Sequence, residues 1–190
     1  MARGYQGQGV PGVTLGSHQT TVGKSQTHFT PRFILDALGP FDLDPCAGDP
    51  RPWDCARENL TEADDGLSRP WGGLRVWLNP PFNRYGVGRW IERLADHGQG
   101  TALLHARTET AWFQPIWRGA SAILFLSERV IFCKADGSPQ TISNPESKHY
   151  GKPANSGAPV VLAAFGRTDA ELLAASGLRG ALVTDWIAAA

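Results

Sequence analysis

The chain of 190 residues has the length of one α/β domain with a sizeable core. Its 18 Lys and Arg residues equal its 18 Asp and Glu residues, so the net charge neither indicates nor excludes a nucleic-acid partner. The three cysteines are scattered and lack the spacing of metal ligands, so we expect neither a zinc site nor disulfides. We see no pattern of a leader peptide and no apolar run long enough to span a bilayer, so we expect a cytoplasmic protein that is not bound to a membrane.

Residues 1–26 contain six glycines among Gln, Ser and Thr, without an apolar period. This composition predicts a mobile arm, followed by one domain over residues 27–190. Arg3 and Lys24 could bring the arm against a phosphate backbone, although polar termini are commonly just disordered.

A helix is expected directly after the arm. Thr30 suits the N-cap, Pro31 the first helical position and Gly39 the end. The next run, 41–44, alternates as a short strand and places Asp44 at its carboxyl end. Ligands of open α/β sheets bind at that end, so Asp44 is a candidate binding residue.

Residues 49–69 give a weaker pattern. A helix or an irregular segment is expected near 53–60, and short buried strands could be present. Asp64-Asp65-Gly66 is typical of a solvated turn.

The central stretch is 74–82, where an apolar strand runs into Asn79-Pro80-Pro81-Phe82. The prolines cannot donate to a ladder and fix φ at about −65°, so a rigid loop begins where the strand ends. Asn79 and Pro80 offer carbonyl acceptors and Phe82 offers a ring face. Two acceptors outside the plane of an aryl amine would leave the nitrogen lone pair free to react, without a general base. A plain strand-ending turn is the alternative reading.

Beyond this loop the pattern alternates between helices and strands. Helices are expected up to Gly98, near 109–117, and from a capping box at Thr168 to Gly177. Apolar runs cover 101–105, 121–126, 129–133 and 159–165. His105 ends one such strand, where a hydrogen-bonded structural role is commoner than a catalytic one.

The segment 134–158 is long, polar and without a period. Such connections inside compact domains are often functional. Lys134, Lys148 and Lys152 make it the candidate DNA-facing loop.

Asn79-Pro80-Pro81-Phe82 resembles the catalytic motif of methyltransferases that act on the amino group of adenine in DNA. With the stretches 28–31, 41–48 and 107–113, the chain resembles phage-type DNA N-6-adenine methyltransferases (Dam-like) from about residue 28 to 166. The resemblance implies a Rossmann-like class I S-adenosylmethionine-dependent methyltransferase fold, α/β with a single open twisted sheet flanked by helices. It implies a monomer or weak dimer in a bacterial or phage-infected cell, methylating N6 of an adenine flipped out of double-stranded DNA onto Phe82.

The resemblance also assigns residues. The carboxylate of S-adenosyl-L-methionine would lie at Thr30-Pro31, where a helix N-terminus attracts anions, and its ammonium at Asp44. Asp64 or Asp65 would receive the adenine amino group of the cofactor, with Glu58 a weaker candidate for the ribose. The implied cofactor-binding residues are Phe29, Thr30, Pro31, Asp44, Pro45, Cys46, Ala47, Asp64 and Asp65, and the catalytic residues are Asn79, Pro80, Pro81 and Phe82.

Two other functions stay open. A protein glutamine N-methyltransferase can use a similar loop, because an amide nitrogen also needs acceptors and an aromatic wall. A catalytically inactive DNA-binding protein with this fold is favoured by the missing Gly-x-Gly after Asp44, of which only Gly48 remains.

Overall fold

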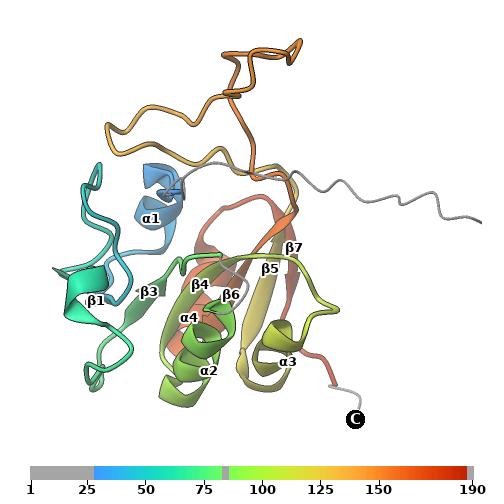
Figure 1. Cartoon of the computed structure of the whole chain (residues 1–190). Helices are drawn as coiled ribbons and strands as arrows, with labels where there is room; N and C mark the ends of the chain where they lie inside the picture. Colours follow the sequence, from blue (N-terminus) through green and yellow to red (C-terminus); the bar gives the residue numbers. More distant parts are fainter. Residues whose placement is uncertain (1–27, 83–85, 188–190) are drawn as a thin grey trace, which may run out of the picture.

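The computed structural model of the chain describes residues 28–82 and 86–187, so the arm expected over 1–26 lies outside it. Within these ranges one sheet has the strand order β2-β1-β3-β4-β6-β5-β7 (Figure 1). The strands are β1 (Leu43–Asp44), β2 (Glu58–Asn59), β3 (Val76–Leu78), β4 (Gly100–His105), β5 (Ala122–Leu126), β6 (Val160–Phe165) and β7 (Gly180–Val183).

The sheet is mixed. Strands β2, β1, β3 and β4 are parallel to one another, whereas β6 is antiparallel to β4 and β5, and β7 is antiparallel to β5. The chain leaves β1 on one side to form β2 and returns on the other side to form β3. The carboxyl ends of β1 and β3 therefore flank a topological switch point, the position at which α/β sheets bind ligands.

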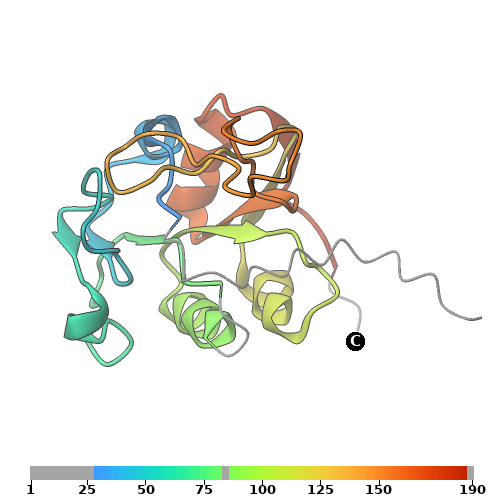
Figure 2. The same ribbon diagram turned by 45° about the horizontal axis from the view of Figure 1, so that its top comes forward.

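Helices cover both faces of the sheet (Figure 2). α1 (Arg32–Leu38) and α4 (Arg167–Ala175) cover one face, and α2 (Val87–His97) and α3 (Gln114–Gly119) cover the other. In β3, Val76 and Leu78 pack into the core beneath α2, while Trp77 packs into the core beneath α1. The expected α/β class with one helix-flanked sheet is confirmed. No helix in the described part of the chain is long and apolar enough to cross a membrane.

The start of α1 corrects the sequence prediction. The N-cap is Pro31, in an extended conformation with ψ 139°, and no side chain caps the helix. Thr30 is therefore wrong as the N-cap: it lies one residue outside the helix cap, where its carbonyl accepts a hydrogen bond from Trp53 Nε1 at 3.2 Å. Gly39 ends the helix as expected.

The start of α4 is a second correction. The helix begins at Arg167 after Gly166, and no side chain caps it, so the capping box predicted from Thr168 is wrong. Asp169 is instead buried, and its Oδ1 accepts hydrogen bonds from Thr101 at 2.8 Å and Arg75 Nε at 3.0 Å. Glu171, the partner that a capping box from Thr168 requires, instead accepts a hydrogen bond from Arg167 Nε at 2.7 Å.

Three further segments differ in detail. The strand expected over 41–44 is reduced to Leu43–Asp44, and the segment near 53–60 contains β2 but no helix. The helix expected over 109–117 is divided into a 3-10 helix, η2 (Ala111–Phe113), and α3, with Pro115 in the first turn of α3.

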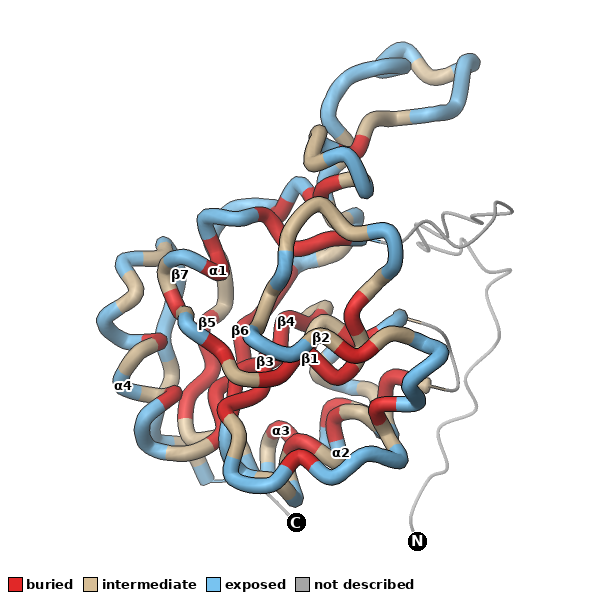
Figure 3. Tube along the Cα trace, turned by 90° about the vertical axis from the view of Figure 1, so that its left-hand side faces the viewer, coloured by how far each residue is buried: buried red, intermediate tan, exposed pale blue. Residues whose placement is uncertain are grey.

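The segment 134–158 rises away from the sheet and is largely exposed (Figures 1 and 3). It has its own ladder: Ile142 N–H donates to the Lys152 carbonyl, and Gly151 N–H donates to the Ile142 carbonyl, each at 2.9 Å. The base of the segment is fixed to the domain by paired backbone hydrogen bonds between Phe29 and Cys133, at 3.1 and 2.8 Å.

Candidate active site

Asp44 and Asn79 lie at the carboxyl ends of two adjacent parallel strands. Asp44 ends β1, Asn79 directly follows β3, and Leu43 is in register with Val76. A narrow cavity of about 40 Å³ lies at these strand ends, and its walls include Thr30, Asp44, Trp77 and Asn79. Three residues predicted for the site, Thr30, Asp44 and Asn79, thus lie together at the switch point of the sheet.

Asp44 is a buried carboxylate without a strong cationic partner. It is 4% exposed, and its Oδ1 accepts a hydrogen bond from Cys46 N–H at 3.0 Å. Burial raises its pKa from 3.8 to about 6, although hydrogen bonds from Cys46 and Cys55 and the charge of Arg51 act in the opposite direction. A cationic ligand in the cavity would stabilise the ionised form of this group.

Three buried polar atoms around the same cavity have no hydrogen-bond partner: Thr30 Oγ1, Trp77 Nε1 and Asn79 Oδ1. Thr30 is 1% exposed and Trp77 is fully buried. Buried polar atoms are nearly always paired in native proteins, so a cluster of unpaired ones calls for a ligand or ordered water. A hydroxyl and an indole N–H can donate to a carboxylate while Asp44 accepts from an ammonium, so the cavity suits the amino-acid end of a ligand.

The amide of Asn79 is oriented by its nitrogen. Nδ2 donates to the carbonyl of His28 at 2.9 Å, which leaves Oδ1 as the free end. His28 precedes the Phe29–Cys133 pair, so this anchoring carbonyl is held against the base of the segment 134–158. The result is a preoriented acceptor at the start of the Asn-Pro-Pro-Phe loop.

Phe82, at the end of that loop, stacks on His105 at the end of β4. Their ring centroids are 4.3 Å apart and their planes differ by 13°. Burial lowers the pKa of His105 to about 4, with the charges of Arg107, His28 and Arg129 acting in the same direction. The imidazole is therefore neutral at physiological pH.

The remaining predicted site residues fall into two groups. Phe29, Cys46 and Ala47 line the cavity, and Pro31 and Pro45 adjoin residues that line it. Asp64 and Asp65 do not line it: Asp64 caps η1 (Glu62–Asp64) through Thr61 at 2.8 and 2.9 Å, and Asp65 accepts from the hydroxyl of Ser68.

The turn that follows Asp65 nevertheless packs against the loop after β1. A Cβ on Gly66 would lie 1.9 Å from the Pro45 carbonyl oxygen, so only glycine permits this approach. The cofactor roles of Asp64 and Asp65 stay predictions. The DNA-binding roles of Lys134, Lys148 and Lys152 also stay predictions, and among the described ion pairs none involves these lysines.

Sequence reasoning missed His28 and Trp77 as site residues. His28 contributes a backbone carbonyl, which no side-chain pattern can reveal. The sequence predicts Trp77 as a strand residue of the core, and its buried indole N–H becomes visible as an unpaired donor only in three dimensions.

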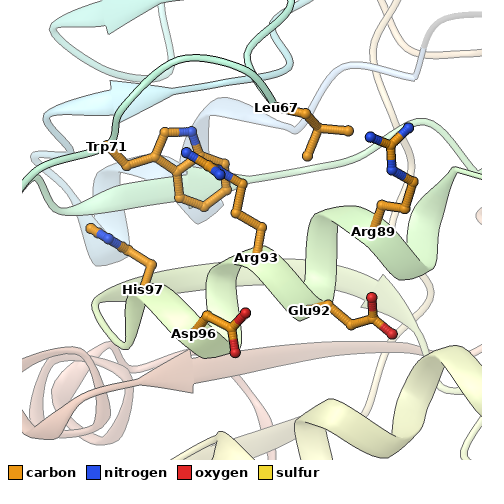
Figure 4. Close-up of a pocket in the computed structure, with 7 residues that line it drawn as sticks. All are labelled: Leu67, Trp71, Arg89, Glu92, Arg93, Asp96 and His97. Atoms are coloured by element: carbon orange, nitrogen blue, oxygen red, sulfur yellow. The ribbon is translucent and has the colours of Figure 1, made fainter.

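A larger hollow of about 440 Å³ runs along α2 and is a different feature (Figure 4). Arg93 lies over the ring of Trp71 there, 4.7 Å from its centroid, with Glu92 and Asp96 nearby. Its lining contains none of the predicted site residues and mixes both signs of charge, so we place the chemistry at the strand ends. Among the described residues, no group of three or more His, Cys, Asp or Glu side chains could hold a metal ion.

Comparison with known families adds one finding. A family model described as DNA N-6-adenine-methyltransferase (Dam) matches residues 19–150. The match includes Thr30, Asp44, the Asn-Pro-Pro-Phe loop and most of the segment 134–158. No curated protein and no solved structure matches the chain.

Proposed function

The chain belongs to the DNA N-6-adenine-methyltransferase (Dam) family, and from this premise we propose that it transfers a methyl group from S-adenosyl-L-methionine to N6 of adenine in double-stranded DNA. The observation that carries the proposal is the unpaired, buried Oδ1 of Asn79, oriented by His28 and sharing a cavity with Asp44. We take the sheet to be the Rossmann-like sheet of class I methyltransferases, and its switch point between β1 and β3 supports this assignment.

The cofactor fits the cavity through its amino-acid end. Asp44 would accept from the ammonium, while Thr30 Oγ1 and Trp77 Nε1 would donate to the carboxylate. A cavity of about 40 Å³ has room for a small charged group rather than for the whole cofactor, which therefore extends beyond it. When bound, S-adenosyl-L-methionine supplies an electrophilic methyl group that passes from sulfur to the acceptor nitrogen, which then loses a proton.

The acceptor nitrogen would be held by the Asn-Pro-Pro-Phe loop. Asn79 Oδ1 and the Pro80 carbonyl accept the two hydrogens of the adenine amine, and this favours a nitrogen whose lone pair points out of the ring plane. Because N6 is inaccessible inside a duplex, the base must be flipped out, at a cost of about a few kcal/mol. Stacking on Phe82, worth about 1–3 kcal/mol, and the two hydrogen bonds offset that cost.

Double-stranded DNA would be met by the segment 134–158. Its three lysines outnumber Asp136 and Glu146, giving a formal charge of +1 with His149 neutral. Lys148, Lys152 and Tyr150 are exposed on it, and its base contacts Phe29, beside the cavity. Cations next to an exposed aromatic ring suit phosphate contact close to a flipped base.

Methyl transfer from cofactor labelled in its methyl group tests the proposal. Unmethylated plasmid DNA, RNA and a glutamine-rich protein are offered in parallel, and the products are digested and identified. We expect label in N6-methyldeoxyadenosine. Label in protein glutamine would favour a protein methyltransferase, and cofactor binding without transfer to any acceptor would favour an inactive DNA-binding protein.

A further inference from the structure

The ring of Phe82 has one face already covered. The imidazole of His105 lies against it at 4.3 Å with nearly parallel planes, and rings at this distance leave no room for a third ring between them. A flipped base can therefore reach only the opposite face of Phe82, provided that the pair stays together.

His105 is the more firmly held member of the pair. It ends the six-residue strand β4, which pairs with β3 on one side and β6 on the other, and its own register partner is Val160. Phe82 belongs to a loop beyond the end of β3 and takes no part in a ladder. The sheet thus fixes the imidazole, and the imidazole can fix the phenyl ring.

We propose that His105 is a positioning residue, which sets the ring plane of Phe82 so that the face of that ring turned away from the imidazole receives the flipped-out adenine. This inference rests on the proposed function, because it assigns a task within base binding. His105 need not contact the cofactor or the reacting nitrogen.

The imidazole serves as a flat ring rather than as an acid or base. Its pKa of about 4 keeps it neutral, because burial disfavours the imidazolium and, among the residues that the structure describes, Arg107, His28 and Arg129 lower the pKa further. The amine held by Asn79 needs no general base. An aromatic ring without nitrogen should therefore substitute for His105.

Three variants separate this role from the others: His105→Ala, which removes the ring, His105→Phe, which keeps a ring, and Trp90→Ala as the control. Trp90 stacks on Trp71 with an interplanar angle of 13°, and neither residue lines the cavity at the strand ends. The control thus removes another half-buried aromatic stack, outside the proposed site.

The assay measures kcat and KM for methylation of unmethylated plasmid DNA, together with the Kd for the cofactor. We expect His105→Ala to lower kcat/KM for DNA by roughly tenfold or more, the scale of one base–aromatic stacking interaction, with the cofactor Kd unchanged. His105→Phe should stay within about threefold of the parent and keep the parental pH profile of kcat, and Trp90→Ala should reduce thermal stability but not kcat.

Each outcome supports or overturns the inference. If the parent methylates DNA and His105→Ala matches it, the positioning role is wrong while the proposed function stands. If His105→Phe is as inactive as His105→Ala, the imidazole nitrogens are required and the role is a different one. A parent that methylates no DNA would remove both the proposed function and this inference.

Discussion

Replacing Asp44 with Asn should make the cofactor-free protein more stable and should weaken its binding of the cofactor. A rise in pKa from 3.8 to about 6 corresponds to about 3 kcal/mol, since a tenfold change in proton affinity is worth about 1.4 kcal/mol. The folded state binds a proton at Asp44 more tightly than the unfolded state does. The contribution of protonated Asp44 to the free energy of unfolding is thus fully present below pH 3.8 and is lost as the pH rises through about 6.

Asn mimics the protonated carboxyl at every pH and keeps an oxygen to accept from Cys46 N–H. We therefore expect Asp44→Asn to match the parent near pH 4 and to exceed its unfolding free energy by up to about 3 kcal/mol at about pH 7.5. Urea unfolding at both pH values measures the difference. Titration calorimetry at the higher pH should show S-adenosyl-L-methionine bound about 1–3 kcal/mol more weakly, the scale of a hydrogen bond to a charged group.

The two measurements together test the reasoning. A variant that is less stable than the parent at the higher pH would show that the Asp44 carboxylate does not destabilise the empty site. An unchanged cofactor Kd would remove Asp44 from the cofactor site, whatever happens to stability.

Two other changes probe the walls of the site. Trp77→Phe should weaken cofactor binding by about 1 kcal/mol, because it removes the unpaired indole N–H. It should also lower thermal stability, because Trp77 is fully buried and the smaller ring leaves a cavity. The control Trp71→Phe removes a donor that bonds the Gly66 carbonyl at 2.9 Å and should destabilise without this effect on affinity. Equal cofactor Kd values for Trp77→Phe and the parent would refute the donor role. Replacing Lys134, Lys148 and Lys152 with Ala should weaken DNA binding and flatten its salt dependence, by roughly 0.9 in slope for each phosphate that a lysine no longer neutralises, while the exposed Arg167→Ala on α4 should not. A parental salt slope in the triple variant would move DNA binding elsewhere, with Arg3 and Lys24 as the next candidates.

The features that could be predicted from sequence are local ones. β3, β4 and β6 are apolar runs that end at polar, proline or glycine residues. Gly98, at φ 74°, ends α2 because it tolerates the left-handed conformation. The sequence pattern does not predict the edge strand β7, because its residues are mostly exposed and its conformation comes from pairing with β5. It misplaces the start of α4, because Glu171, the expected partner of Thr168 in a capping box, pairs with Arg167 instead.

The site also has features that the sequence predicts and features that only the fold brings together. The carboxylate of Asp44 and the amide of Asn79 could be placed at strand ends from the sequence, since a strand and two prolines determine where they lie. The group that orients the amide could not, because the carbonyl of His28 comes from 51 positions earlier in the chain. The stack of Phe82 on His105 likewise depends on two strands lying side by side.

The central claim is that the free Oδ1 of Asn79 grips the acceptor amine, and single-turnover methylation by Asn79 variants tests it most directly. With saturating labelled cofactor and unmethylated plasmid DNA, Asn79→Ala should methylate on the order of a hundredfold or more slowly than the parent, by analogy with the loss of one preorganised polar group. Asn79→Asp keeps an acceptor oxygen but loses the donor to His28, so its rate should lie between the two. The cofactor Kd should change little in either variant. Near-parental single-turnover methylation by Asn79→Ala would contradict the account and leave the Asn-Pro-Pro run as a plain turn.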